Sequence, residues 1–258
     1  MSIYGEAIWV SGSPSLRGLS TPLINKLVKH TNIYGWEYIQ SIDDPACMNT
    51  AVELLHSYLK TKQIPVHLIG HSTGGTIALM LARKYPNFVK SLTLLSVAAQ
   101  PAKTWHVNYY QQRQIYTLSK AEALFNTLNN VFRNKYPCCL HNLIDNFYRD
   151  LENLPLMHSL LKIESLPSGG VLMPLMVCGG QIDMILGYPD YHEWKKYLQP
   201  EDILWKCPQG GHFFHYFYPE IVKEQILHFW RSHKLGVEKE VMNMANGEWG
   251  IGNWELGN

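Results

Sequence analysis

The sequence of 258 residues has little of several features that mark whole classes of protein. No apolar run approaches the roughly 18 residues of a membrane-spanning helix. The stretch from Met1 to Ser15 has no basic start and only a short apolar run, so we expect no secretion signal. The formal net charge is +1, and the Lys and Arg residues are scattered. This charge pattern argues against nucleic acid or an acidic membrane surface as a partner.

Cysteine is also sparse, with five residues at dispersed positions. In a chain without a secretion signal, we expect reduced thiols and a cytoplasmic location. The run from Cys138 to His141 contains two cysteines and a histidine. Adjacent cysteines do not easily share one tetrahedral metal site, and no second Cys/His pair stands at zinc-finger spacing. We therefore expect turn or core residues here, and no metal or cofactor in the protein.

The length suits one α/β domain with a full core, or such a domain with a modest insertion. Apolar residues make up 46% of the chain and charged residues 17%, which is ordinary for a globular protein.

The most informative stretch runs from Pro65 to Thr76 and reads PVHLIGHSTGGT. An apolar run over 66–69 is typical of a buried strand, and the apolar residues after the motif fall at helical spacing. Between them lies the pattern G-x-S-x-G, with Ser72 at the centre. Glycines at 70 and 74 allow strand and helix backbones to approach closely, so this pattern predicts a sharp turn with an exposed serine hydroxyl.

The same residues spell most of a phosphate-binding loop, G-x-x-x-x-G-K-[ST]. Gly75 is followed directly by Thr76, and the lysine that contacts phosphate is missing. A five-residue motif also recurs by chance, so the interpretation of Ser72 depends on strands, helices and further residues elsewhere.

Strand-like and helix-like segments alternate along the chain, which predicts a mostly parallel sheet of about six strands flanked by helices. Besides 66–69, we expect strands at Ala7–Val10, Trp36–Ile42, Ser91–Val97, Val171–Cys178 and Asp202–Cys207. Thr21 and Pro22 resemble an N-cap and first helical residue. Residues 98–168 break the alternation with helical spacing only, which predicts a helical insertion.

With strand, turn and helix around Ser72, the sequence resembles the α/β-hydrolase fold superfamily. The resemblance implies a core of residues 1–97 and 169–235, with 98–168 as a helical cap. It also implies a catalytic triad in the chain order serine, acid, histidine. The acid of the family follows a late strand in a G-x-x-D arrangement, which Gly180 to Asp183 match. Asp190 and Glu193 are rivals further from the strand end.

The base of the family lies in the loop after the last strand. His212 follows a Gly-Gly turn there, and His215 is a rival that lies past the turn. The family also binds the developing oxyanion with two backbone amides. Thr73, at a helix N-terminus, supplies one, and the resemblance implies Ser13 as the other. Family members usually have a His-Gly pair before that second donor, whereas this chain has Ser11-Gly12.

These residues imply a serine hydrolase that cleaves a small hydrophobic carboxylic ester or thioester through an acyl-enzyme. Aromatic residues near the expected site, Trp105 and Phe213 in particular, are candidates to bind the substrate. The same triad also serves C–C bond hydrolases, acyltransferases and lyase-type synthases. A ligand-binding member of the fold without catalysis is a further alternative.

The C-terminal segment 236–258 contains two near-copies of a short Gly/Trp unit. It has no periodic apolar face, so we expect a disordered tail without a catalytic role. A protein-interaction role for this Trp-containing tail is an alternative.

Overall fold

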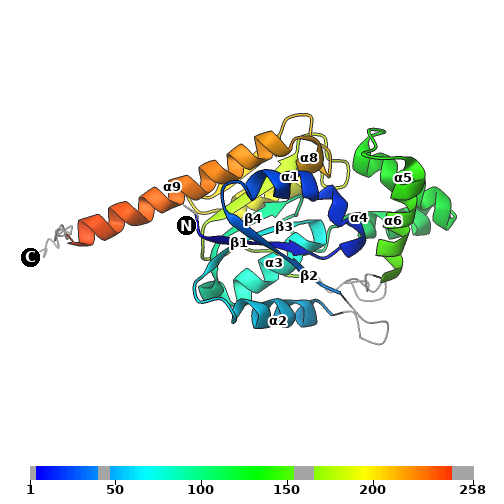
Figure 1. Cartoon of the computed structure of the whole chain (residues 1–258). Coiled ribbons are helices and arrows are strands. Elements are labelled where there is room, and N and C mark those ends of the chain that lie inside the picture. The colour runs from blue at the N-terminus through cyan, green and yellow to red at the C-terminus, as the bar shows by residue number, and fades with distance from the viewer. Residues whose placement is uncertain (1–3, 40–46, 154–165, 246–258) are drawn as a thin grey trace, which may run out of the picture.

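A computed structural model describes residues 4–39, 47–153 and 166–245 of the chain (Figure 1). These residues form a six-stranded sheet in the order β2-β1-β3-β4-β5-β6, and every neighbouring pair is parallel. The predicted α/β fold with about six mostly parallel strands is confirmed. The strands are β1 (Glu6–Ser11), β2 (Asn32–Glu37), β3 (Val66–His71), β4 (Val89–Leu95), β5 (Leu175–Gly180) and β6 (Ile203–Cys207).

Helices cover both faces of this sheet (Figure 1). One face is covered by α2 (Met48–Leu59) and α3 (Ser72–Lys84), and the other by α1 (Thr21–Leu27) and α9 (Pro219–Ala245). Strand β1 shows why two cores form: Ile8 and Val10 pack on the first face, whereas Ala7 and Trp9 pack on the second. Successive side chains of a strand point to opposite faces, so a strand that is apolar throughout is buried on both.

Between β4 and β5 the described residues form three helices, which we call the cap helices: α4 (Trp105–Tyr116), α5 (Lys120–Phe132) and α6 (Leu140–Asn153). Helix α5 begins with a capping box, in which Ser119 and Glu122 bond each other's backbone N–H. The cap helices pack on the short helix η1 (Pro14–Leu19) through an apolar cluster that includes Leu16, Leu19 and Phe147. They therefore lie beside the edge of the sheet where β1 ends (Figure 1).

The remaining short helices lie in loops. They are η2 (Pro86–Phe88), α7 (Tyr188–His192), η3 (Glu193–Lys196) and α8 (Phe214–Phe217).

Strands β4 and β5 start at Val89 and Leu175 rather than at 91 and 171. Three further boundaries differ from the prediction. Strand β2 spans Asn32–Glu37 rather than 36–42, of which 40–42 lie outside the described residues. It is an edge strand paired only with β1 and is largely exposed, so it lacks the apolar run that marks a buried strand. The N-cap of α1 is Ser20, and Thr21 is already helical.

The third difference concerns the C-terminus. Helix α9 continues to Ala245 and so includes residues 236–245 of the expected tail. Residues 237–245 are rich in Glu, Lys, Met and Ala, which favour helix even without a periodic apolar face. The Gly/Trp units at 246–258 lie outside the described residues.

Candidate active site

Ser72 lies at the turn where β3 meets α3, in the backbone conformation of a strained elbow. Its φ angle is +47°, in the left-handed region that residues other than glycine seldom adopt. The two motif glycines make the turn possible. A Cβ at Gly70 would lie 2.6 Å from the Cα of Gly75, and one at Gly74 would collide with the carbonyl oxygen of Val10. The sharp turn and its glycines thus follow from close backbone packing.

His212 and Asp183 meet beyond the ends of β6 and β5. The Nδ1 atom of His212 lies 3.0 Å from Oδ2 of Asp183, and both side chains are fully buried. Asp183 Oδ1 accepts the backbone N–H groups of Ile185 at 2.8 Å and Leu186 at 3.1 Å. The carboxylate is therefore held on both oxygens, and the imidazole is oriented with Nε2 facing away from it.

This environment keeps Asp183 ionised. Burial alone would raise the pKa of Asp183, but the charge of His212, its hydrogen bond and the two amides together lower the pKa below its usual value. The hydroxyl of Tyr191 also donates to Asp183 Oδ2 at 3.1 Å. Burial, followed by the charge of Asp183, raises the pKa of Tyr191 well above its usual value, so this hydroxyl keeps its proton.

Two residues that the sequence did not indicate hold the backbone of His212. Ser96 Oγ donates to the His212 carbonyl oxygen at 2.8 Å and lies 3.3 Å from Asp183 Oδ2. His71 Nε2 lies 3.1 Å from the same carbonyl, and a hydrogen bond there requires Nε2 to carry the proton. Since His71 directly precedes Ser72, this contact connects the turn that carries Ser72 to the loop that carries His212.

Ser96 could have been suspected from its place directly after β4, where a polar residue follows a largely buried strand. Like Ser72, it has a positive φ, of +49°. No short motif connects it to His212, which lies 116 residues away in the chain.

The reacting atoms of the expected triad are buried and available. Among the described residues, neither Ser72 Oγ nor His212 Nε2 makes a hydrogen bond. The structure therefore joins His212 to Asp183, but it shows no hydrogen bond from Ser72 to His212. Such contacts are often long before substrate binds.

Ser72 opens into a small pocket, which we call the serine pocket, of about 20 Å³. Its walls include Ser13, Arg17, Ser72, Trp105 and Phe213. The two aromatic candidates for substrate binding thus lie beside the serine. Phe213 also stacks on Phe132 with ring centroids 5.5 Å apart, so it connects the pocket to the cap helices.

The two expected oxyanion donors are placed differently. Ser13 lines the serine pocket, and its backbone N–H donates to Ser11 Oγ at 3.4 Å. Thr73 is the second residue of α3, where backbone N–H groups have no partner in the preceding turn. The two segments are in contact, because a Cβ at Gly12 would lie 2.9 Å from Cγ2 of Thr73. Thr73 itself is buried and is not part of the pocket wall.

The rival residues lie in other contacts. His215 is fully buried, and neither ring nitrogen has a hydrogen-bond partner among the described residues. Burial, with the charge of His212 as a smaller cause, lowers the pKa of His215 to about 3. Asp190 is paired with Lys103 and accepts the N–H of Gly187 at 2.9 Å. Glu193 begins helix η3 and is partly buried.

Two further observations concern the described part of the chain. Within it, no group of three or more His, Cys, Asp or Glu side chains is arranged to hold a metal ion. Nor does any helix there have the length and apolarity to span a membrane.

Comparison with known proteins assigns the family. A family model described as the alpha/beta hydrolase fold matches residues 48–219. The chain therefore belongs to the α/β-hydrolase fold family, as the motif around Ser72 suggested.

Its relatives by sequence include two uncharacterized proteins. One, from Nostoc sp., is 45% identical over 230 residues, which cover 89% of this chain and 92% of the relative. The other, from Synechocystis sp., is 36% identical over 225 residues, which cover 87% of this chain and 90% of the relative.

Solved structures with the same fold include esterases and lipases. A putative lipase from Acinetobacter baumannii has a TM-score of 0.70 at 18% identity, over 90% of this chain and 85% of that protein. Naproxen esterase from Bacillus subtilis has a TM-score of 0.67 at 18% identity, over 88% of this chain and 83% of that protein. At these identities the likeness concerns the fold alone.

Proposed function

We propose that the protein is a serine hydrolase that cleaves a carboxylic ester or thioester, with Ser72 as nucleophile, His212 as general base and Asp183 as the acid of the triad. One observation carries the proposal: His212 Nδ1 is fixed at 3.0 Å from a buried carboxylate, which leaves Nε2 without a partner among the described residues. Nε2 is the atom that must take a proton from the serine. That the family's solved members include esterases agrees with this choice.

The chemistry follows from the contacts. Because Asp183 is ionised and accepts from Nδ1, the neutral imidazole carries its proton on Nδ1 and offers a lone pair at Nε2. His212 Nε2 takes the proton of Ser72 Oγ as that oxygen bonds to the substrate carbonyl carbon. The imidazolium then returns this proton to the departing alcohol or thiol, and an acyl-serine remains. Water, activated by the same nitrogen, releases the acid.

The backbone amides of Ser13 and Thr73 are the proposed donors to the oxyanion. The N–H of Ser13 now reaches Ser11 Oγ at the long distance of 3.4 Å, so a substrate oxygen replaces only a weak contact. The N-terminus of α3 favours negative charge next to Ser72. Each such donor contributes about 3 kcal/mol to stabilising the transition state.

The serine hydroxyl is the part to test first. Ser72→Ala is expected to abolish hydrolysis of p-nitrophenyl butyrate, measured as nitrophenolate release, because the proposed acyl-enzyme forms on the oxygen that this change removes. Ser232→Ala is the matched control: its hydroxyl bonds the carbonyl of Phe229 on α9, so activity should be unchanged. Hydrolysis that persists in the Ser72 variant would overturn the assignment.

A substrate panel distinguishes ester hydrolysis from the other reactions of this triad. The wild-type enzyme is expected to turn over p-nitrophenyl butyrate and butyryl-thioesters, but not 1,3-diketones. If it cleaves only a diketone, the reaction class is C–C hydrolysis. If acyl groups appear only on an added alcohol, it is acyl transfer.

A further inference from the structure

The small size of the serine pocket raises the question of where the rest of a substrate lies. A volume of about 20 Å³ is close to what one water-sized group needs. It therefore admits the reacting atoms and little else. Next to it lies a larger groove of about 770 Å³, which we call the side groove. Its volume is in the range of small-molecule binding sites.

The two spaces are adjacent and share part of their walls. Trp9, Ser11, Arg17 and Ser20 line both. The side groove is further lined by Trp36 and Glu37 at the end of β2, and by Asn146 and Arg149 on α6. The side groove is therefore formed jointly by the core and the cap helices, and it adjoins the serine pocket at Arg17.

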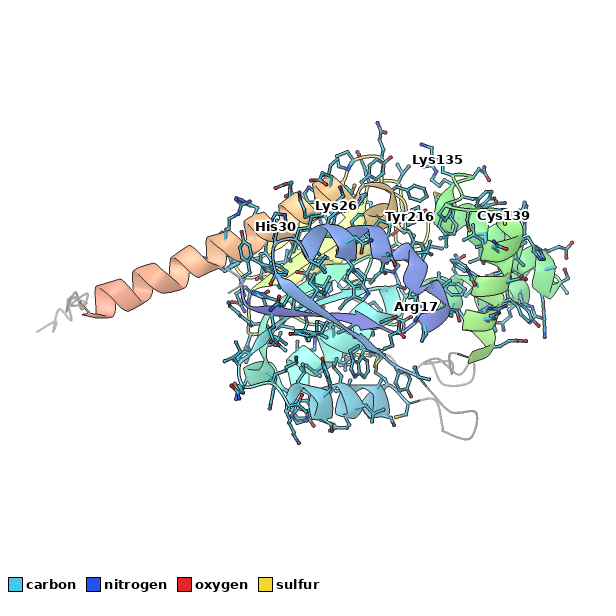
Figure 2. All side chains as sticks on the ribbon, in the orientation of Figure 1. Arg17, Lys26, His30, Lys135, Cys139 and Tyr216 are labelled. Carbon is cyan, nitrogen blue, oxygen red and sulfur yellow. The ribbon has the colours of Figure 1, made fainter. Side chains whose placement is uncertain are left out.

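The positions of the arginines follow from the packing of η1 and α6. Leu16 and Leu19 of η1 are buried against the cap helices, so Arg17 between them is left exposed on the groove side. Figure 2 shows Arg17 on η1, between the sheet with its flanking helices and the cap helices. Arg149 is exposed on α6, the helix that packs on η1.

The charged side chains that line the side groove are two arginines, Arg17 and Arg149, and one carboxylate, Glu37. Among residues 4–39, 47–153 and 166–245, no ion pair involves Arg17, Arg149 or Glu37. Two cations and one carboxylate therefore give the groove walls a positive balance. Arginine presents a planar set of N–H donors that matches the oxygens of a carboxylate or phosphate.

We propose that the side groove binds an anionic group of the substrate, held by Arg17 and Arg149, while the scissile carbonyl lies in the serine pocket. The substrate class is then an ester or thioester with an apolar segment beside Trp9 and Trp36 and a carboxylate or phosphate at its far end. This inference deepens the proposed hydrolase function and rests on it for the reaction, but the binding of the anion does not require turnover.

The turnover test compares two esters that differ in one charge. Wild type should hydrolyse mono-p-nitrophenyl adipate with a higher kcat/KM than p-nitrophenyl hexanoate. Arg17→Gln should lower kcat/KM for the adipate ester roughly ten-fold, since a charge-assisted hydrogen bond contributes about 1.5 kcal/mol or more. Because both esters share the serine pocket, the measured quantity is the ratio of kcat/KM for the adipate ester to that for the hexanoate ester. Arg17→Gln should lower this ratio, and Arg149→Gln should lower it too.

Arg133→Gln is the matched control, because Arg133 is an exposed arginine at the end of α5 that lines neither space. It should leave both esters unchanged. Equal effects of Arg17→Gln on the two esters, or equal effects of Arg17→Gln and Arg133→Gln, would overturn the proposal.

A binding test separates this inference from the proposed function. Trp9 and Trp36 line the groove, so tryptophan fluorescence of the Ser72→Ala variant should report binding of adipate, hexanoate or hexyl phosphate, but not hexan-1-ol. The tighter of the carboxylate and the phosphate identifies the anion. Loss of this binding in the Ser72→Ala, Arg17→Gln double variant supports the groove even if no ester is hydrolysed. Equal binding of hexan-1-ol and the anions would contradict it.

Discussion

The two sides of the serine pocket are built in different ways. On the core side, Asp183 accepts from His212, Tyr191 and two backbone amides, and Ser96 and His71 bond the backbone of His212. On the cap side, Trp105 belongs to the apolar cluster formed by η1 and the cap helices, and the exposed Arg17 on η1 has no ion-pair partner among the described residues. Hydrogen bonds hold a group in one orientation, whereas an apolar surface can pack against groups of different shape. We infer that the core side fixes the chemistry and the cap side selects the substrate.

The variant with the largest expected effect on the core side removes the negative charge of Asp183. Asp183→Asn is expected to lower kcat about 10⁴-fold, because the amide no longer holds the imidazole in the tautomer with Nε2 free. Initial rates with p-nitrophenyl butyrate measure the effect. Asp190→Asn, which removes a carboxylate paired with Lys103, should change the rate little. Comparable losses in both variants would mean that Asp183 has no special part in the reaction.

Ser96 tests whether the positioning contacts matter. Loss of its hydroxyl should lower kcat about ten-fold with little change in KM, because the His212 carbonyl then keeps only His71 as a hydrogen-bond partner in the described part of the chain. Ser96 has a φ of +49°, so two variants are needed. Ser96→Ala and Ser96→Gly differ in how well they accept that angle but both lack the hydroxyl. Equal losses point to the hydrogen bond, while a loss in the alanine variant alone points to backbone strain.

The buried side chain of His215 makes the stability of the folded protein depend on pH. Burial lowers its pKa to about 3, so the folded protein keeps it neutral where an unfolded histidine, with a pKa of about 6.5, takes a proton. Stability is therefore lost as pH falls from about 6.5 toward 3, by about 2 kcal/mol at about pH 5. The pKa of Asp183 is lowered, so the stability that Asp183 contributes is lost only when the pH falls below about 4, the ordinary pKa of an aspartate.

Substituting a group that does not titrate should remove this part of the acid sensitivity. His215→Leu is expected to reduce the difference in unfolding free energy between about pH 7 and pH 5 by about 2 kcal/mol, as measured by urea unfolding. His67, whose pKa is also about 3, is unchanged in this variant, so part of the difference in unfolding free energy between the two pH values should remain. An unchanged difference between the two pH values would show that His215 does not titrate as described.

The smallest effect is expected on the cap side. Trp105 lines the serine pocket and packs on Phe147, with ring centroids 4.8 Å apart. Trp105→Phe keeps an aromatic ring there, so kcat should stay within about two-fold, whereas KM should rise a few-fold for long acyl chains. A series of p-nitrophenyl esters of increasing chain length measures both. A large fall in kcat with unchanged KM would place Trp105 with the core-side residues instead.

The sequence allowed the family, the six-stranded sheet and the turn at Ser72 to be predicted, because each rests on a local pattern. Buried parallel strands show as apolar runs, and the turn needs glycines at fixed offsets. The edge strand β2 and the end of α9 were misplaced, since neither carries such a pattern.

The contacts of Ser96, Tyr191 and Arg17 could not be predicted in the same way. They depend on how distant loops meet: Ser96 reaches His212, and Tyr191 reaches Asp183 from α7. The side groove likewise is lined by residues of β1, β2, η1 and α6, which are distant from one another in the chain. Such tertiary placements leave no local signal in one sequence.

The central claim is that Ser72 is the nucleophile activated by His212. Its most direct test is reaction of the whole protein with a fluorophosphonate, followed by peptide mass spectrometry. The account predicts one adduct per chain, located on Ser72, and at least about a hundred-fold slower labelling of His212→Gln. An adduct on any other residue, or labelling of His212→Gln at the wild-type rate, would contradict it.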